Sequence, residues 1–214
     1  MSYSTTTQII AKEGWKYVTF TFLLWLFFMW IDFFEWVFFF LFVLTLYMFR
    51  NPERIPDEDD ALAILAPSDG KIASIGKDEN GYLKVSIEKS IFDVSLLRSP
   101  CGLSIEKTTK IHGLFLPSSD LLSNFLNERI FLTCKRRENV FHINIIAGLF
   151  SRKIDLFKTI GSLKVSQRCG LLVDGRVDIL LPKDVRIKVA LGDKVNAGQS
   201  ILGYFSYDKV NDAS

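Results

Sequence analysis

The sequence predicts a mostly β domain that follows a membrane-embedded helical hairpin. The stretch from Val18 to Phe49 is apolar at nearly every position, and most of the charge of the 214-residue chain falls after it. Beyond Arg50, short β-branched or aromatic segments alternate with Gly, Pro, Asp and Asn, which is typical of strands joined by turns. A long apolar stretch followed by short strands indicates a membrane anchor and a β domain.

These changes of composition divide the chain into five parts. They are an N-terminal cytoplasmic segment (1–17), a membrane helical hairpin (18–49), a linker with two prolines (50–62), a β domain (63–207) and a tail (208–214).

Two carboxylates in the apolar stretch favour a hairpin over a single span. One helix through 18–49 would be about 48 Å long at about 1.5 Å per residue, whereas the hydrocarbon core is about 30 Å thick. It would also place Asp32 and Glu35 near the bilayer centre, where each carboxylate raises the free energy of membrane insertion by about 2.5–3.5 kcal/mol. We therefore expect Val18–Ile31 to enter and Trp36–Phe49 to return, as a transmembrane or re-entrant hairpin that turns between them.

The flanking residues orient this hairpin. Lys12 and Lys16 precede it and Arg50 and Arg54 follow it, so the positive-inside rule places both ends in the cytoplasm. Trp25, Trp30, Trp36 and Tyr47 are interface anchors in this interpretation. A cleaved signal peptide is the main alternative, but the stretch begins late and is too long. A buried core hairpin is disfavoured because every helical face is apolar.

Charge and cysteine content exclude several function classes. A net charge of +2 and the single short basic run Lys135-Arg136-Arg137 give no basis for nucleic-acid binding. Cys101, Cys134 and Cys169 are widely spaced and have no His at metal spacing, so we expect buried thiols in a reducing compartment and no metal site.

The β domain is expected to be a sandwich or barrel with few helices. One helix is predicted, at Ser119–Leu126. The expected strands are Ala63–Ala66, Lys71–Ile75, Leu83–Ile87, Leu103–Glu106, Ile130–Cys134, Val140–Ile146, Lys153–Phe157, Val177–Leu181, Val185–Ala190 and Ser200–Phe205. The Leu191–Gln199 segment resembles the hairpin of biotinyl and lipoyl carrier domains and other barrel-sandwich hybrid folds, but no lysine motif of a carrier is present.

A series of motifs in a fixed order resembles the short form of phosphatidylserine decarboxylase over nearly the whole chain. The motifs are Phe49-Arg50-Asn51-Pro52-Glu53-Arg54, Pro67-Ser68-Asp69-Gly70, Phe92-Asp93-Val94, Asn127-Glu128-Arg129, Ile146-Ala147-Gly148-Leu149, Arg168-Cys169-Gly170-Leu171, Arg176-Val177-Asp178-Ile179-Leu180-Leu181-Pro182 and the Gly192–Gln199 hairpin. The resemblance implies the barrel-sandwich-hybrid-like fold of that family.

The resemblance also implies a chemistry. Members of the family cut themselves at a Gly-Ser bond, and the Ser becomes an N-terminal pyruvoyl group. That ketone forms a Schiff base with phosphatidylserine and accepts electrons as CO₂ leaves, which yields phosphatidylethanolamine. No external cofactor is expected, because the family generates its pyruvoyl group from its own chain.

This sequence departs from the family at the processing site. Where the family has Phe-Gly-Ser-Arg-Val-Asp, the chain reads Val173-Asp174-Gly175-Arg176-Val177-Asp178, so Gly175 is followed by Arg176 with no Ser, Thr or Cys. We therefore interpret Asp174, Gly175 and Arg176 as a degenerate processing site.

A second departure concerns the catalytic His. The family has His-Val-Asn-Arg after Phe-Asp-Val, and the corresponding residues here are Ser95-Leu96-Leu97-Arg98, so Ser95 marks the degenerate His position. Of the processing and catalytic groups only Asp69 is retained as a candidate catalytic residue; its alternative role is that of a turn residue. His142 is expected to be structural.

Three functions remain open. The first is an unprocessed, non-catalytic relative of the decarboxylase, linked to phospholipid biosynthesis. The second is an active carboxy-lyase that matures at another site, for which Gly161-Ser162 is the one Gly-Ser pair. The third is a carrier-like or assembly module. The expected location is the cytoplasmic side of the cell (inner) membrane, and the expected partners are a membrane phospholipid, such as phosphatidylserine, and a second copy of the chain.

Overall fold

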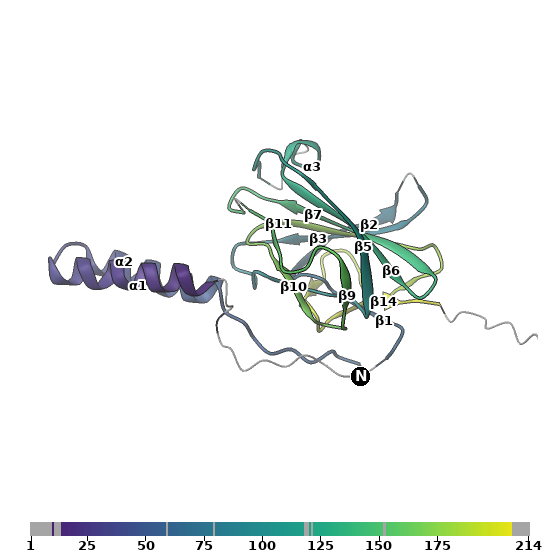
Figure 1. The fold of residues 1–214 in the computed structure, drawn as a ribbon, viewed down its shortest axis with the longest axis horizontal. Helices are drawn as coiled ribbons and strands as arrows, with labels where there is room; N and C mark the ends of the chain where they lie inside the picture. Colours follow the sequence, from purple (N-terminus) through teal and green to yellow (C-terminus); the bar gives the residue numbers. More distant parts are fainter. Residues whose placement is uncertain are drawn as a thin grey trace, which may run out of the picture.

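A β domain and a helical hairpin make up the structure, a computed structural model (Figure 1). It describes residues 10, 14–58, 60–78, 80–117, 120, 122–151 and 153–206. Lys12, Ser119 and the predicted tail therefore lie outside the described residues.

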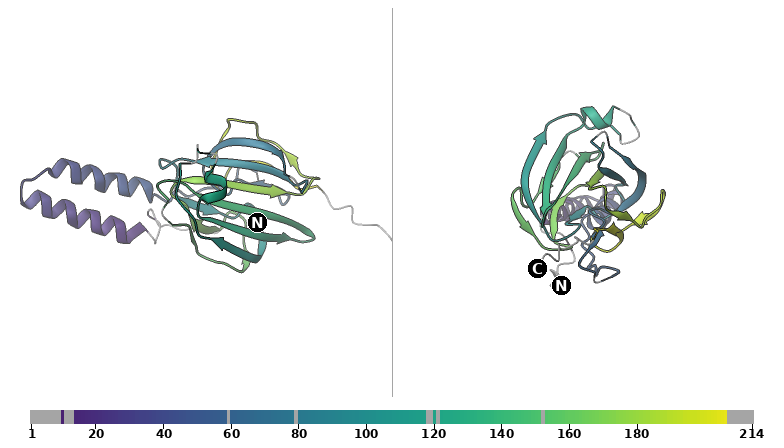
Figure 2. Two further views of the ribbon diagram at one scale, coloured as in Figure 1. Left: turned by 90° about the horizontal axis from the view of Figure 1, so that it is seen from above. Right: turned by 90° about the vertical axis from the view of Figure 1, so that its right-hand side faces the viewer.

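The hairpin consists of α1 (Trp15–Trp30) and α2 (Glu35–Met48), which run side by side and project away from the β domain (Figure 2). The chain reverses between them, where Asp32 and Phe34 have φ values of 55° and 48°. Aromatic rings join the helices; Phe28 and Phe38 stack with centroids 3.7 Å apart. Most of the other aromatic side chains of the hairpin are exposed.

The helices contain 16 and 14 residues, which corresponds to about 24 and 21 Å. No helix in the described part of the chain combines the length and the hydropathy that a membrane crossing requires.

The prediction of a mostly β fold is confirmed. The β domain contains an eight-stranded antiparallel sheet in the order β13-β2-β3-β11-β7-β6-β5-β9 and two three-stranded sheets, β1-β14-β12 and β4-β10-β8. The strands of the large sheet are β2 (Gly70–Lys77), β3 (Leu83–Lys89), β5 (Leu103–Ile111), β6 (Arg129–Arg136), β7 (Asn139–Ala147), β9 (Gly161–Leu163), β11 (Gly175–Leu181) and β13 (Lys194–Val195). Those of the small sheets are β1 (Ala63–Leu65), β14 (Ile201–Tyr204), β12 (Arg186–Ile187), β4 (Leu96–Arg98), β10 (Arg168–Leu171) and β8 (Asp155–Leu156).

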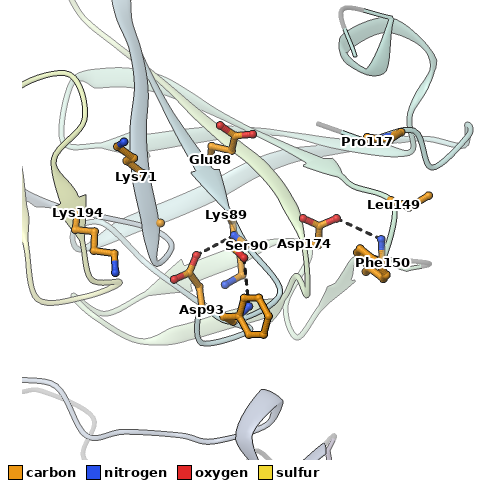
Figure 3. A pocket seen from close by; sticks show the side chains of 12 residues that line it. Lys71, Glu88, Lys89, Ser90, Asp93, Pro117, Leu149, Phe150, Asp174 and Lys194 are labelled. Atoms are coloured by element: carbon orange, nitrogen blue, oxygen red, sulfur yellow. Dashed lines mark hydrogen bonds between the residues drawn. The ribbon is translucent and has the colours of Figure 1, made fainter. Parts of the chain in front are cut away.

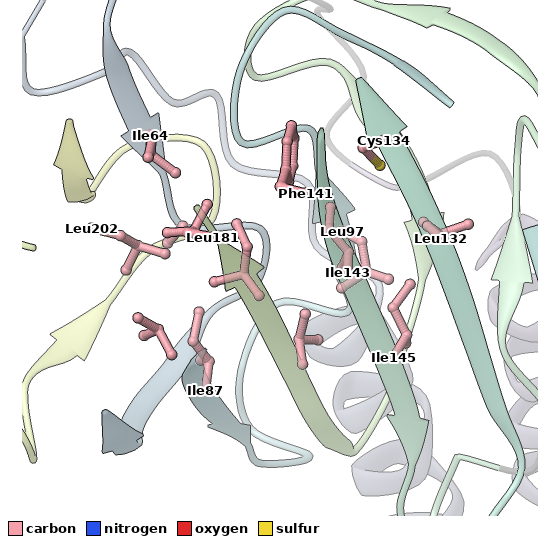
Figure 4. Close-up of a cluster of buried hydrophobic side chains, with 14 of the residues drawn as sticks. Ile64, Ile87, Leu97, Leu132, Cys134, Phe141, Ile143, Ile145, Leu181 and Leu202 are labelled. Carbon is pink, nitrogen blue, oxygen red and sulfur yellow. The ribbon is translucent and has the colours of Figure 1, made fainter. Parts of the chain in front are cut away.

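Period-two alternation builds the core. Phe141, Ile143 and Ile145 of β7 point to one face of the sheet, where they belong to the same buried cluster as alternate residues of β11 such as Leu181 (Figure 4). The thiols of Cys101 and Cys134 are buried in the same core, and burial raises the pKa of both to about 12.

Three predicted elements are much shorter than expected. The strands predicted at Lys153–Phe157 and Val185–Ala190 are reduced to the two-residue strands β8 and β12. The helix predicted at Ser119–Leu126 is a single turn, α3 (Ser123–Leu126). The side chain of Asn127, just after it, bonds to the backbone of Leu116 and Ala147 at 2.8 Å each. The backbone of Asn127 is extended, so the helix ends at residue 126. The side-chain bonds of Asn127 hold the chain in this extended conformation.

The segment between the hairpin and the first strand is attached to the β domain. Arg50 donates a 3.0 Å hydrogen bond to the Phe92 carbonyl, and the Pro52 carbonyl accepts one of 3.2 Å from Arg98. The segment thus fixes the base of the hairpin beside the loop that precedes β4.

Candidate functional site

A cavity of about 590 Å³ opens at the end of the large sheet where β2 and β11 begin and β3 ends (Figure 3). Three lysines and three acids line it together with apolar side chains. The lining residues are Gly70, Lys71, Glu88, Lys89, Ser90, Phe92, Asp93, Pro117, Leu149, Phe150, Asp174 and Lys194. The cavity therefore brings Asp174, one of the three residues of the predicted degenerate processing site, together with the Phe92-Asp93 motif.

The loop 148–151 holds Asp174 at the edge of this cavity. The Asp174 carbonyl accepts a 2.9 Å hydrogen bond from the Gly148 amide, and its carboxylate accepts one of 3.2 Å from the Phe150 amide. Its own amide donates to the buried Ser151 Oγ at 2.7 Å. These contacts fix the peptide that corresponds to the family's scissile bond.

Gly175 is enclosed by backbone on both sides. It pairs with Lys89 of β3 and Ala147 of β7, and its φ is 138°. A Cβ at this position would lie 2.1 Å from the Ile146 carbonyl oxygen and 2.7 Å from the Gly148 nitrogen. In the intact chain, position 175 has room only for glycine.

Arg176 is not among the described residues that line the cavity. Alternation along β11 places Val177 in the core and Arg176 on the opposite face, where its Nε lies 3.2 Å from Asp178 Oδ1. The Asp178 carboxylate also contacts Lys84 Nζ at 3.0 Å. The predicted processing residues are therefore split between two faces of the sheet.

Asp69, the candidate catalytic residue, is 5% exposed and is occupied by four donors. Arg54 forms a two-pronged ion pair with it, in which the Nη2 to Oδ2 distance is 2.7 Å. The amides of Ala197 and Val94 donate to the same carboxylate at 2.8 and 3.3 Å. Its contacts are thus not those of a local turn, because they join segments far apart in the chain.

These contacts set the ionisation of Asp69. Burial by itself raises the pKa of the carboxyl, but hydrogen bonds from Arg54 and the Ala197 amide outweigh it, and the pKa lies below its ordinary value. Asp69 is therefore ionised near pH 7, and the described lining of the cavity does not include it.

Ser95, at the degenerate His position, connects the β domain to the hairpin. Its Oγ donates a 3.0 Å hydrogen bond to the Met48 carbonyl at the end of α2, and the side chain is buried. The two histidines are elsewhere: His112 is exposed beside Glu128, and His142 lies between the rings of Tyr82 and Phe131.

Replacing Ser95 by Ala is expected to lower the free energy of unfolding by about 0.5–1.5 kcal/mol, because a buried hydrogen bond to the end of α2 is lost. Thermal unfolding in detergent measures the loss, and limited proteolysis between residues 50 and 56 should accelerate. Ser104→Ala, at an exposed position of β5, is the control. Equal stability of the two variants would contradict a tethering role for Ser95.

Lys89 was not identified from the sequence, although a signal is present. Val85 and Ile87 alternate toward the core in β3, and the next residue on that face is Lys89, which is 1% exposed. A lysine that continues an apolar alternation predicts a buried amine.

A second crevice, of about 810 Å³, lies between the base of the hairpin and the β domain. Lys16, Tyr17, Phe20, Thr45 and Lys153 contribute to its walls. Phe150 lines both this crevice and the cavity at Asp174, so the two openings are neighbours.

Comparison with known proteins identifies the family. The family model described as phosphatidylserine decarboxylase matches residues 41–203. The chain is 35% identical over 175 residues to a phosphatidylserine decarboxylase proenzyme of Geotalea uraniireducens (strain Rf4), which covers 77% of this chain and 82% of the relative. It is 31% identical over 204 residues to a protein of the same name from Paraburkholderia phymatum (strain DSM 17167 / CIP 108236 / LMG 21445 / STM815), covering 91% of this chain and 96% of the relative. The chain belongs to the phosphatidylserine decarboxylase family.

Proposed function

We propose that this chain is an unprocessed, non-catalytic member of the family that binds a phospholipid headgroup at the cytoplasmic face of the cell membrane. One observation carries the proposal: the Asp174-Gly175-Arg176 segment offers no nucleophile, and position 175 has no space for a side chain that would supply one. Self-cleavage at this bond requires a hydroxyl or thiol on the downstream residue.

A pyruvoyl group does not fit these residues. It would have to arise from the residue at position 175, which is glycine and has its Cβ direction closed by the Ile146 carbonyl oxygen. Ser95, at the position predicted for the family's His, has a different contact, because its Oγ donates a hydrogen bond to the Met48 carbonyl at the end of α2. We therefore assign no decarboxylation step to this chain.

Membrane attachment is supported by the surface of the hairpin. Phe20, Leu23, Trp30, Trp36 and Phe40 are each more than half exposed, an apolar surface that water does not favour. The hydroxyls of the two buried threonines bond to helix carbonyls, as polar groups in a bilayer must. With arms of about 21–24 Å, the hairpin would enter the membrane but would be shorter than a hydrocarbon core about 30 Å thick.

Headgroup binding is supported by charge in the cavity. Lys71 and Lys194 are paired residues of β2 and β13, so two ammonium groups face one opening. Phe92, Leu149 and Phe150 provide exposed apolar surface on the same lining. A phosphate near the lysines would leave its acyl chains beside Phe150, next to the hairpin crevice.

Maturation at Gly161-Ser162 is the second candidate function. These residues form β9, the terminal strand of the large sheet, and pair with Ser104 and Ile105 of β5. In the strand order β9 is at the opposite end from β2 and β13, whose residues line the cavity. The arrangement favours a structural role for this pair.

Intact mass and lipid binding test the proposal together. The purified full chain should have a mass near 24.5 kDa with no fragments, and it should release no CO₂ from phosphatidylserine. In detergent, Lys71→Glu/Lys194→Glu should weaken binding of a short-chain phosphatidylserine, whereas Lys77→Glu, exposed on the same strand, should not. Two fragments or CO₂ release would establish the active alternative, and equal lipid binding by all three proteins would refute the headgroup site.

A further inference from the structure

Lys89 is a buried amine at the place where the family carries its reactive group. It is 1% exposed and is the register partner of Gly175 across β3 and β11. Alternation places both residues on the same face of the sheet, since Ile87 and Val177 are also partners and both are buried. Cross-strand neighbours of this kind have Cβ positions about 4.5–5.5 Å apart.

The Lys89 amine has a hydrogen bond but no close counter-ion. Its Nζ donates to the Val94 carbonyl at 2.6 Å. Asp69 is occupied by Arg54, and Asp93 accepts a 2.8 Å bond from the Ser90 amide. Among the ion pairs of the described residues, none joins Lys89 to a carboxylate.

This environment lowers the pKa of Lys89 to about 8. Burial is the largest cause; the charges of Asp69 and Asp93 oppose it, and Arg54 and Arg50 add to it. A larger fraction of this amine is therefore neutral near pH 7 than for a lysine with the ordinary pKa of 10.5. A neutral, desolvated lysine is the form that attacks carbonyl carbon.

We propose that Lys89 forms a Schiff base with an anionic keto compound that enters the cavity at Asp174. The geometry supports this, because Lys89 lines the 590 Å³ cavity (Figure 3). Lys71 and Lys194 line the same cavity from the opposite face of the strands, where they attract a negative charge. The roles of the two reactants are reversed relative to the chemistry implied by the family. Here the protein supplies the amine and the ligand supplies the ketone. The proposal does not depend on lipid binding or on the absence of self-cleavage.

The reaction balances without a further reactant. The Nζ lone pair forms a bond to the carbonyl carbon, and the C=O π electrons move to oxygen. One proton passes from nitrogen to oxygen as the carbinolamine forms, and a second passes as the C–O bond breaks and the oxygen leaves as water, so amine plus ketone gives imine plus water. Borohydride then adds hydride to the imine carbon and a solvent proton completes a stable secondary amine.

The test is reductive trapping on the full chain in detergent, with levulinate as the anionic keto acid and 2-butanone as its uncharged counterpart. The expected product carries the mass of levulinate minus one oxygen atom, is located at Lys89 by peptide mapping, and forms at pH 7 to 8. Labelling by levulinate should exceed labelling by 2-butanone at least tenfold, because only the keto acid is attracted to Lys71 and Lys194.

Two variants test whether the adduct requires the Lys89 amine itself or only its positive charge. Lys89→Arg keeps the positive charge but lacks the lysine amine, and Lys89→Met fits the buried site without charge; both should lose the adduct. Lys77→Met, exposed on β2, should keep it. Labelling that is spread over exposed lysines, or that persists in both Lys89 variants, would overturn the proposal.

Discussion

Replacing Asp69 by Asn is expected to lower the free energy of unfolding by about 3–5 kcal/mol, because it leaves the Arg54 guanidinium buried without its counter-ion. The side chains of Arg54 and Asp69 are 10% and 7% exposed, so water does not replace the carboxylate that Arg54 loses. The Ala197 and Val94 amides lose a charged acceptor in the same substitution. Urea unfolding of the detergent-solubilised protein measures the change.

Two comparisons make this expectation specific. Glu53→Gln removes an exposed carboxylate next to Arg54 and should change the stability by less than about 0.5 kcal/mol. Arg54→Met in the Asp69→Asn background removes the uncompensated charge and should recover part of the loss. If Asp69→Asn were as stable as Glu53→Gln, the ion pair would not stabilise the fold.

The same pair gives a defined pH dependence. The pKa of Asp69 in the folded protein is below its ordinary value of about 3.9, so the unfolded chain binds more protons in that range. The stabilisation is complete above the ordinary value and is lost as the pH falls through the folded-state value. The difference between the parent protein and Asp69→Asn should therefore be largest above about pH 5 and should narrow on acidification.

The sequence predicts those elements whose evidence is local. Apolar alternation in β7 and β11 identifies both strands, and Asp32 with Glu35 identifies the reversal between α1 and α2. Four strands were missed, β4, β9, β10 and β13, because each has only two to four residues and each contains Gly, Arg or Lys. Their stability comes from pairing with distant strands.

The site is predictable in its residue types but not in its geometry. The loss of the nucleophile at Gly175 is visible in the sequence, whereas the closure of this position by the Ile146 carbonyl requires the register of β7 and β11. The contacts of Asp69 are equally non-local, because the Ala197 amide lies 128 residues further along the chain.

Restoring a Gly-Ser pair with Asp174→Gly/Gly175→Ser is expected to destabilise the protein and not to restore self-cleavage. A side chain at position 175 must adopt a φ near 138°, which costs on the order of 1–3 kcal/mol for a non-glycine residue. The overlap of its Cβ with the Ile146 carbonyl oxygen adds to that cost, since the backbone of residues 146–148 must move. Gly175→Ala isolates this steric effect, and Gly76→Ala, in open space on β2, is the control that should change the stability little.

Self-cleavage would also need a group to accept the proton of the new hydroxyl. The position predicted for the family's His holds Ser95, whose Oγ donates a hydrogen bond to the Met48 carbonyl, and Asp69 is paired with Arg54. General-base assistance is commonly worth about 10²–10⁴-fold in rate, so we expect the serine alone not to cleave the chain. The double variant should therefore run as one band of unchanged mass on a denaturing gel. Two fragments, the second with a ketone-blocked N-terminus, would mean that the surrounding fold still directs the cleavage and that the parent protein lacks only its nucleophile.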